Sequence, residues 1–543
     1  MIIGIDLDNT IINYEDAFKK ASQDIFQVPD LVFESAKGIS HKDRIKSYLI
    51  DSTKVSQNAW ERLQGQVYSS YIKEASIFVG VKNFLLRCSL EDIKVYIISH
   101  KTKFGHYDKK KIPLRLEAIN FLDRNNFFNK FTGLTKQDVF FLKTRKEKID
   151  KISELKVTHF IDDLKEIFED ASFPESIDKT LFKDSSQVDD EGLFISWFQI
   201  HEKFFGEISE VDINNYTSFL FKKKPLTTSS IKGRANSKLF EIHLEKKKKF
   251  AGKLYPDPIQ DKRNRIITEK KAYDLLNSNK IQESPKLVSC SKDLNFTLIE
   301  WIEGEDVVTI NQEDISQAYK FIKRIKKISD RTRFHDFSLA SAACLCGLDI
   351  EKQIISRMEK FTSYLPSDHP VITFIQENLS PSFSNTLEHS KKNWPMDFSQ
   401  KLEKEELVLS PSDFGFHNAI KTDKGIKFID FEYFGWDDPV KLTCDFILHP
   451  GMELTKELRR YWIEGMKNLF SKDKLFHKRV QCSLGLYVIC WCLIVLNNFL
   501  KYDKKNPSTE GAKTDENLLN YLSRSKDLLN YVNKNNLEEI LYE

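Results

Sequence analysis

Three short apolar runs constrain the fold of this chain most, because each ends in side chains that can take part in chemistry. The runs are IIGIDL at 2–7, VYIISH at 95–100 and THFIDD at 158–163. Short, continuous apolar runs are typical of strands buried on both faces, as in a parallel sheet. Helical patterns fill the stretches between the runs. We therefore predict an α/β domain with a parallel sheet, whose ligand site lies at the carboxyl ends of the strands.

The residues at these strand ends suit phosphoryl chemistry. Asp6 and Asp8 lie two residues apart, a spacing that points two strand side chains to the same side. One carboxylate could attack phosphorus while the other transfers a proton, and Mg²⁺ would offset their repulsion. Ser99 ends the second strand, where its hydroxyl can bond a phosphoryl oxygen. Asp162 and Asp163 end the third strand and offer the hard oxygen ligands that Mg²⁺ prefers.

In this order and spacing, residues 1–205 resemble the haloacid dehalogenase-like hydrolase superfamily. The matching features are the run Asp6-Leu7-Asp8-Asn9-Thr10, the strand-ending Ser99 and the acidic pair Asp162/Asp163. The resemblance implies a Rossmann-like phosphohydrolase domain in which Asp6 forms an aspartyl-phosphate and Asp8 is the general acid/base. The long stretch between Thr10 and the second strand would hold a small helical cap.

The same resemblance implies a lysine near the acidic pair. Lys148 opens the helical run KIDKISEL before the third strand and is the predicted residue, with Lys143 and Lys146 as alternatives. A degenerate domain, kept for binding or packing, is the competing interpretation, because paired carboxylates also have structural roles.

A second group of residues lies in the other half of the chain. Asn418 follows Asp413 by five positions, and Asp430 follows twelve positions later. Kinases need a carboxylate near the acceptor hydroxyl, and an Asn and an Asp to hold Mg²⁺ on the nucleotide phosphates. Upstream, Lys253 in the strand-like run FAGKLYP can reach phosphates. Glu269, in the helix predicted to follow, can pair with that lysine.

Residues 226–543 thereby resemble the aminoglycoside phosphotransferase and choline kinase-like family. The family's His-Gly-Asp-x-x-x-x-Asn loop is present with Pro411 and Ser412 in place of the His and the Gly, which leaves the loop geometry open. The resemblance implies a two-lobed, protein kinase-like α+β domain, with an N-lobe over about 226–303 and a C-lobe over about 304–543. It also implies ATP and Mg²⁺ as cofactors. Further nucleotide contacts are expected from Gly233, in a turn, and from the hinge residues Glu300 and Ile302.

Between the two halves, residues 206–225 look polar and irregular and are predicted to form a linker. The chain carries 83 basic and 80 acidic residues, so no global field favours nucleic acid or a membrane surface. The apolar run Leu484–Leu496 is too short to cross a bilayer and is predicted to be a core helix. The N-terminus lacks a signal-peptide pattern, and the eight cysteines lack zinc-site spacing. A cytoplasmic location with reduced thiols is expected.

The leading hypothesis is a bifunctional enzyme that adds phosphate to, and removes it from, small hydroxylated metabolites such as a sugar, an amino alcohol or a glycan precursor. Alternatives are a kinase with a scaffolding N-terminal domain, an antibiotic phosphotransferase, and a non-enzymatic interaction protein. The expected partners are a nucleotide and a small-molecule substrate. The acceptor, the choice between ATP and GTP, and the oligomeric state stay open.

Overall fold

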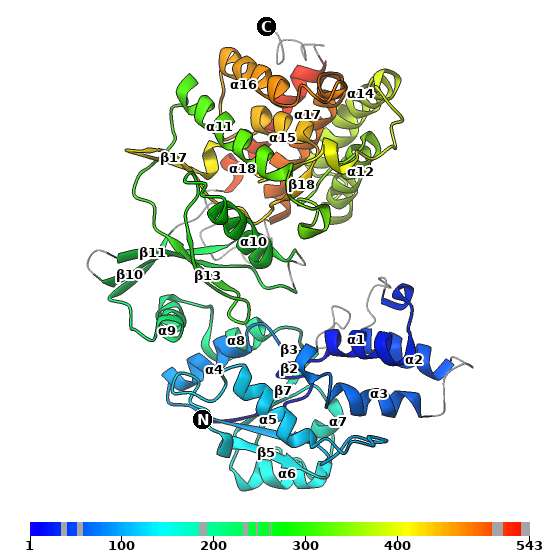
Figure 1. Ribbon diagram of the computed structural model, residues 1–543, viewed down its shortest axis with the longest axis vertical. Helices are drawn as coiled ribbons and strands as arrows, with labels where there is room; N and C mark the ends of the chain where they lie inside the picture. The colour runs from blue at the N-terminus through cyan, green and yellow to red at the C-terminus, as the bar shows by residue number, and fades with distance from the viewer. Residues whose placement is uncertain are drawn as a thin grey trace. The chain divides into compact units, whose positions relative to one another are not determined.

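The computed structural model describes the chain except for residues 34–40, 52–57, 184–192, 232–236, 246–247, 260, 262, 502–513 and 534–543. The chain forms two compact units, which are described separately (Figure 1). Unit 1 comprises Met1–Ile266 and Val288–Glu300, and unit 2 comprises Ile267–Leu287 and Trp301–Glu543.

Unit 1 is built on a parallel sheet. Among the described residues, six strands lie in the order β5 (Val139–Leu142), β4 (Lys94–His100), β1 (Ile2–Ile5), β6 (His159–Asp162), β7 (Asp178–Phe182) and β8 (Leu193–Phe194). Every neighbouring pair is parallel. The three strands predicted from the sequence are confirmed, and they are adjacent in space because β1 pairs with β4 on one side and β6 on the other. Their carboxyl ends therefore meet at one edge.

Helices connect the strands and cover the sheet. They are α4 (Val81–Leu90), α5 (Leu114–Arg124), α6 (Arg145–Glu154), α7 (Lys165–Phe168) and α8 (Trp197–Phe205). Thr144 caps helix α6, because its hydroxyl accepts the Glu147 backbone N–H, and the helix buries Lys148, Ile149 and Ile152 on one face. The expected helical insert lies between β1 and β4. Its helices α1 (Glu15–Phe26), α2 (His41–Asp51) and α3 (Ala59–Val67) pack on one another (Figure 1).

The prediction of an irregular segment over 206–225 is wrong, because the segment contains helix α9 (Glu210–Phe221). Its polar beginning is a helix cap, in which Ser209 and Asp212 satisfy each other's backbone N–H groups. The buried face carries Ile213 and Tyr216. Asp212 also accepts hydrogen bonds from Arg87 of α4 at 3.1 Å. The helix is thus part of the packed unit.

A second sheet completes unit 1. In the described part of the chain its order is β12 (Leu287–Ser291), β13 (Phe296–Glu300), β11 (Lys248–Leu254), β10 (Lys238–Glu245) and β9 (Thr227–Ile231). Strands β10 and β11 pair antiparallel, and β11 contains most of the strand-like run predicted around Lys253. Helix α4 holds the β12–β13 turn, since Lys82 pairs with Asp293 at 2.5 Å and Asn83 donates to the Leu294 carbonyl at 3.1 Å. The compact unit thus extends past position 205 and includes this sheet.

Unit 2 is mainly helical. Its long helices are α11 (Gln312–Ser329), α12 (Gly347–Tyr364), α14 (Ser380–Asn393), α15 (Pro439–Leu448), α16 (Lys456–Leu469), α17 (Phe476–Lys501) and α18 (Thr514–Asn533). Helix α10 (Arg265–Ser278) precedes them and crosses the boundary between the units. Two short antiparallel pairs lie among these helices. Strand β15 (Val408–Ser410) pairs with β18 (Gly435–Asp437), and β16 (Ala419–Thr422) forms a hairpin with β17 (Gly425–Phe428).

Helix α17 contains the predicted core segment but is longer than the apolar run. Of the helices described, it alone is long and apolar enough to cross a membrane by length and composition. However, 83% of its most apolar window is buried inside the protein, which is typical of a core helix. The described part of the chain holds all eight cysteines as free thiols, and Cys344, Cys346, Cys490 and Cys492 are buried.

Candidate active sites

In unit 1 a buried lysine joins two of the predicted carboxylates. Lys148 Nζ lies 2.6 Å from Asp6 Oδ1 and 2.6 Å from Asp162 Oδ2, and its side chain is only 1% exposed. Helix α6 presents Lys148 to the sheet edge, whereas Lys143 and Lys146 are exposed. Removing a lysine from such a triad would leave buried charge without a partner.

The remaining predicted residues of unit 1 lie at the same edge. Ser99 is buried at the end of β4 and lines the cavity that also contains Asp6, Asp8 and Asp163. Carboxylate oxygens of Asp6, Asp162 and Asp163 lie within 4.8 Å of one another, close enough to bind one cation. The strand-end residues predicted from the sequence are therefore brought together.

Burial shifts the titration of this cluster. Burial raises the pKa of Asp6 to about 7, although Lys148 works in the opposite direction. Burial also raises the pKa of Asp163, and the neighbouring Asp6 and Asp162 charges add to that effect. Burial alone would lower the pKa of Lys148, but Asp6 and Asp162 outweigh it and raise that pKa. A bound cation would relieve the repulsion among the three carboxylates.

Residues that were missed in the sequence surround Asp8. Lys101 Nζ contacts both Asp8 carboxylate oxygens, at 2.8 and 2.7 Å, and the Tyr14 hydroxyl donates to Asp8 Oδ1 at 2.7 Å. The Lys101 ammonium also lies 4.9 Å from the centre of the Tyr68 ring. A local signal for Lys101 existed, because it follows the strand-ending Ser99 by two positions. Tyr14 and Tyr68 gave none, since they come from the helical insert.

The site opens into a cavity of about 400 Å³. Sheet-edge residues form its base, and Lys42, Gln64, Gly65 and Tyr68 from the helical insert form part of its wall. Its cationic side chains are Lys42, Lys101, Arg145 and Lys148. The cavity suits an anionic ligand of small-molecule size.

In unit 2 the predicted base and its loop form a compact turn. Asp413 follows β15, and the Asn418 side-chain amide donates to the Asp413 carbonyl at 3.0 Å. The Ile429 backbone N–H donates to the Asn418 carbonyl at 2.9 Å, which brings the segment before Asp430 beside this loop. His417 Nε2 lies 3.0 Å from Asp413 Oδ1. Burial would raise the pKa of Asp413, but the His417 hydrogen bond and the nearby His449 lower it overall.

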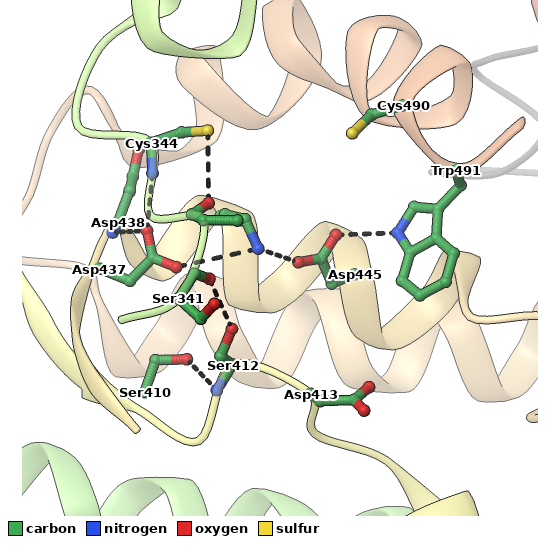
Figure 2. A network of polar contacts seen from close by, with 12 residues as sticks. Ser341, Cys344, Ser410, Ser412, Asp413, Asp437, Asp438, Asp445, Cys490 and Trp491 are labelled. Carbon is green, nitrogen blue, oxygen red and sulfur yellow. Dashed lines mark hydrogen bonds and ion pairs between the residues drawn. The ribbon is translucent and has the colours of Figure 1, made fainter. Parts of the chain in front are cut away.

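The loop geometry left open by Pro411 and Ser412 is now defined. Ser412 has φ +67°, in the left-handed region that favours glycine. Two hydrogen bonds hold it there (Figure 2). Its backbone N–H donates to Ser410 Oγ at 3.0 Å, and its hydroxyl donates to the Ser341 carbonyl at 3.1 Å. A serine thus occupies a glycine-like conformation directly before the candidate base.

A second carboxylate cluster lies in unit 2. Oxygens of Glu269, Asp430 and Glu432 lie within 4.8 Å of one another, and the Phe431 backbone N–H donates to Glu269 Oε1 at 3.1 Å. Glu269 was predicted as the partner of Lys253, and it lies with the Asp430 segment within this unit. Asp430 has φ +65°, in the left-handed region that few residues other than glycine, asparagine and aspartate adopt.

The other predicted nucleotide residues are placed as follows. Lys253 is buried in β11. Glu300 ends β13, and Ile302 follows it, half-buried. Gly233 lies outside the described residues. The nucleotide roles of these four residues stay predictions.

A buried polar network lies beside the Asp413 loop (Figure 2). Strand β18 pairs with β15, and its Asp437 accepts the backbone N–H groups of Cys344 at 3.1 Å and Asp438 at 2.9 Å. Lys441 pairs with Asp445, whose other oxygen accepts the Trp491 indole N–H at 2.8 Å. Burial raises the pKa of Asp437 to about 7 despite Lys441 nearby. The network therefore joins β18 to helices α15 and α17.

Comparison with known proteins gives structural neighbours only. No protein-family model and no curated protein matches the sequence. Spectinomycin phosphotransferase APH(9)-Ia, in complex with ADP and spectinomycin, is 14% identical, covers 62% of this chain and 99% of its own, and has a TM-score of 0.43. Plasmodium vivax ethanolamine kinase is 16% identical over 61% of this chain and 93% of its own, with a TM-score of 0.42. Choline kinase from Cryptosporidium parvum Iowa II is 12% identical over 58% and 90%, with a TM-score of 0.40.

Proposed function

We propose that the chain is a bifunctional phosphoryl-transfer enzyme. Unit 1 would be a Mg²⁺-dependent phosphohydrolase of small phosphate esters. The candidate base and metal ligands of unit 2 would serve an ATP-dependent kinase that acts on a small hydroxylated metabolite. The observation that carries the proposal is that each unit gathers its own three-carboxylate cluster beside a further candidate reactive carboxylate, Asp8 in one and Asp413 in the other.

The donor sets suit Mg²⁺. Asp6, Asp162 and Asp163 in unit 1, and Glu269, Asp430 and Glu432 in unit 2, offer only hard oxygen atoms. Asn418 would add an amide oxygen in unit 2. When bound, Mg²⁺ would neutralise carboxylate repulsion and charge on phosphoryl oxygens.

In unit 1 each side chain would have a separate role in hydrolysis. An Asp6 oxygen would attack phosphorus, and the P–O bond to the leaving alkoxide would break. Asp8 would supply the proton that the alkoxide takes up, and would accept one from the water that later releases the phosphate. Lys148 holds Asp6 in place, and the Ser99 hydroxyl would bond a phosphoryl oxygen.

In unit 2 the chemistry is mainly positioning. Asp413 would orient the acceptor hydroxyl and take its proton as that oxygen bonds to the γ-phosphorus and ADP leaves. Asp430 and Asn418 would keep the phosphates in line with the acceptor. Ile302 remains the candidate of this unit for nucleotide contact, while Lys253 and Glu300 lie in unit 1 and their nucleotide roles stay predictions.

One observation favours the alternative in which unit 1 is only a scaffold. The Asp8 carboxylate is already engaged by Lys101 and Tyr14, so proton transfer at Asp8 would require those contacts to loosen. A kinase with a structural N-terminal region would need no such loosening.

Two substitutions on the full chain separate the activities. Asp6→Asn should abolish hydrolysis of a generic phosphate ester, because a neutral amide cannot attack phosphorus, and should leave ATP turnover intact. Asp123→Asn, on the exposed side of α5, is the matched control. Wild-type hydrolysis in the Asp6→Asn protein would refute the nucleophile assignment. Absence of hydrolysis in the wild type would favour the scaffold alternative.

The kinase is tested by comparing Asp413→Asn with Asp430→Asn. Asp413→Asn should lower kcat by roughly two to four decades and leave Mg²⁺-ATP affinity nearly unchanged. Asp430→Asn should weaken Mg²⁺-ATP binding as well, because Mg²⁺ prefers a carboxylate over an amide. The measurements are calorimetric Mg²⁺-ATP titration and mass-spectrometric detection of phosphorylated products from a metabolite pool, with GTP compared as donor. The reverse pattern would mean that the two roles are misassigned.

A further inference from the structure

Two imidazole rings stack beside the candidate base. The His417 and His449 rings are nearly parallel, with centroids 3.6 Å apart and an angle of 6° between their planes. His417 Nε2 lies 3.0 Å from Asp413 Oδ1, and His449 Nε2 lies 3.9 Å from the same oxygen. The two rings are 13% and 18% exposed, whereas the Asp413 side chain is 40% exposed. The carboxylate therefore has imidazoles on one side and an open side for a ligand.

The hydrogen bonds determine which nitrogen of His449 carries the proton. The Gly451 backbone N–H donates to His449 Nδ1 at 3.1 Å. Since a backbone N–H can only donate, Nδ1 must be the unprotonated nitrogen, and Nε2 carries the hydrogen. Burial and the neighbouring His417 lower the pKa of His449 to about 3, which agrees with a neutral ring. His449 thus directs an N–H toward Asp413.

His417 is assigned in the same way. An ionised carboxylate accepts only, so His417 Nε2 must donate to Asp413. Among the described residues His417 Nδ1 has no hydrogen-bond partner, and it is buried. A Cβ on Gly415 would lie 2.8 Å from His417 Nδ1, which shows how closely the backbone encloses this ring.

Neighbouring residues hold the stacked pair in place. The Trp491 ring meets the His449 ring edge to face, with centroids 4.9 Å apart at 81°. Trp491 is itself fixed by its indole hydrogen bond to Asp445 (Figure 2). The imidazoles are therefore pre-organised before any substrate binds.

The same three side chains could suggest a transition-metal site, because their ligand atoms lie within 4.8 Å of one another. Metal ligation needs a lone pair on each imidazole nitrogen. His449 Nε2 instead carries a proton, because Nδ1 is occupied by the Gly451 N–H. The arrangement consequently suits two donors directed at a carboxylate better than three ligands directed at a cation.

We propose that His417 and His449 are positioning residues for Asp413. The His417 N–H holds Asp413 Oδ1 by a hydrogen bond, and the His449 N–H attracts the same oxygen from 3.9 Å, so that Oδ2 is turned toward the acceptor hydroxyl. This inference rests on the proposed kinase function of unit 2. It assigns the two imidazoles an orienting role, with no proton transfer through either ring.

Kinetics of matched variants of the full chain test the role. His417→Leu should lower kcat roughly 10- to 100-fold, the scale of one lost hydrogen bond to a charged group, with the KM for Mg²⁺-ATP unchanged. His417→Gln places an N–H donor at similar reach and should recover most of that loss. His449→Phe keeps the ring stack and the Trp491 contact but removes the N–H, and should lower kcat a few-fold. Unchanged kcat in His417→Leu, or no recovery in His417→Gln, would overturn the proposal.

A second measurement does not depend on turnover. In ¹⁵N-histidine-labelled full-length protein, the signals lost in His417→Gln and in His449→Phe should both belong to rings that carry a proton on Nε2. A ring protonated only at Nδ1, or saturable Zn²⁺ binding that both variants lose, would overturn the assignment in favour of a metal site. If the wild type phosphorylates no acceptor, the proposed function fails, while these signals still decide whether the rings donate to Asp413.

Discussion

Lys101 Nζ contacts both carboxylate oxygens of Asp8, at 2.8 and 2.7 Å. The ion pair is almost completely buried on the lysine side, so it fixes the orientation of Asp8 in the cavity. We predict that Lys101→Met lowers kcat for phosphate-ester hydrolysis by roughly 10- to 100-fold, because a misplaced acid/base loses most of its effect. Lys103→Met makes the same change at an exposed neighbour and should leave the rate unchanged. Equal rates for the two variants would remove Lys101 from the site.

The carboxylates of unit 1 should make its stability depend on Mg²⁺. At a free Mg²⁺ concentration ten times the dissociation constant, binding to the native state alone contributes about 1.4 kcal/mol. We expect Mg²⁺ to raise the midpoint of the thermal transition that Asp163→Asn alters, and that variant should show a much smaller rise. Asp430→Asn, which changes only the cluster in unit 2, is the control and should retain the rise. EDTA should reverse it.

Ser412 provides a test of backbone strain. Its left-handed conformation costs about 1–2 kcal/mol for a residue with a Cβ, and its hydroxyl bond to Ser341 offsets about 1 kcal/mol of this. Ser412→Ala keeps the strain and loses the bond, whereas Ser412→Gly loses both. The glycine variant should therefore be more stable than the alanine variant by about 1 kcal/mol, as measured by denaturant unfolding. The opposite order would show that φ at 412 is not left-handed.

Helix α9 should be required for a stable N-terminal fragment. Asp212 of α9 pairs with Arg87 at 3.1 Å and with His201 at 3.3 Å, and the Asp212 side chain is fully buried. Fragment 1–205 would leave both partners without their carboxylate, at a cost of roughly 3 kcal/mol. Fragment 1–222 retains the pairs and should unfold at a clearly higher temperature. Asp212→Asn in the full chain should reproduce part of the loss; equal midpoints for the fragments would contradict this account.

Asp437 should make the stability of unit 2 depend on pH. Burial raises its pKa to about 7, so between pH 4 and 7 the folded state retains a proton that the unfolded chain releases. Stability then falls as pH rises through this window, by up to about 1.4 kcal/mol per pH unit. Asp437→Asn cannot titrate and should gain stability relative to the wild type from pH 5 to pH 7. Parallel pH profiles of the two thermal midpoints would show that Asp437 is ionised in the native state.

Strand-end residues were the most predictable part of the site. Asp6, Ser99 and Asp162 follow apolar runs, and the parallel pairing of β1 with β4 and β6 necessarily brings them to one edge. The choice of Lys148 over Lys143 and Lys146 depended on which side of α6 faces the sheet, and the sequence alone did not determine this. Helix α9 within residues 206–225 was missed because its beginning is polar. Cap residues such as Ser209 resemble loop residues in sequence when the buried face of the helix is short.

The contacts that depend on tertiary packing were not predictable. Tyr14 reaches Asp8 only because the helical insert packs over the sheet edge. His449 lies far from Asp413 in sequence, and nothing near it indicates that its ring stacks on His417. The packing of the second sheet against α4 was also not predictable, because nothing in the sequence around Asn83 or around Leu294 indicates that these two segments are in contact.

The contacts between α4 and the β12–β13 turn restrict which sequence changes the chain can accept during evolution. Lys82 and Asn83 lie on α4, which packs on the parallel sheet, while Asp293 and Leu294 belong to the β12–β13 turn more than two hundred positions away, yet each pair is joined directly. A substitution at Asp293 alone would leave the buried Lys82 ammonium without its carboxylate. Homologous chains should therefore change positions 82 and 293 together. A recombination between the two halves of the chain should be tolerated only where the β12–β13 hairpin and α4 come from the same parent.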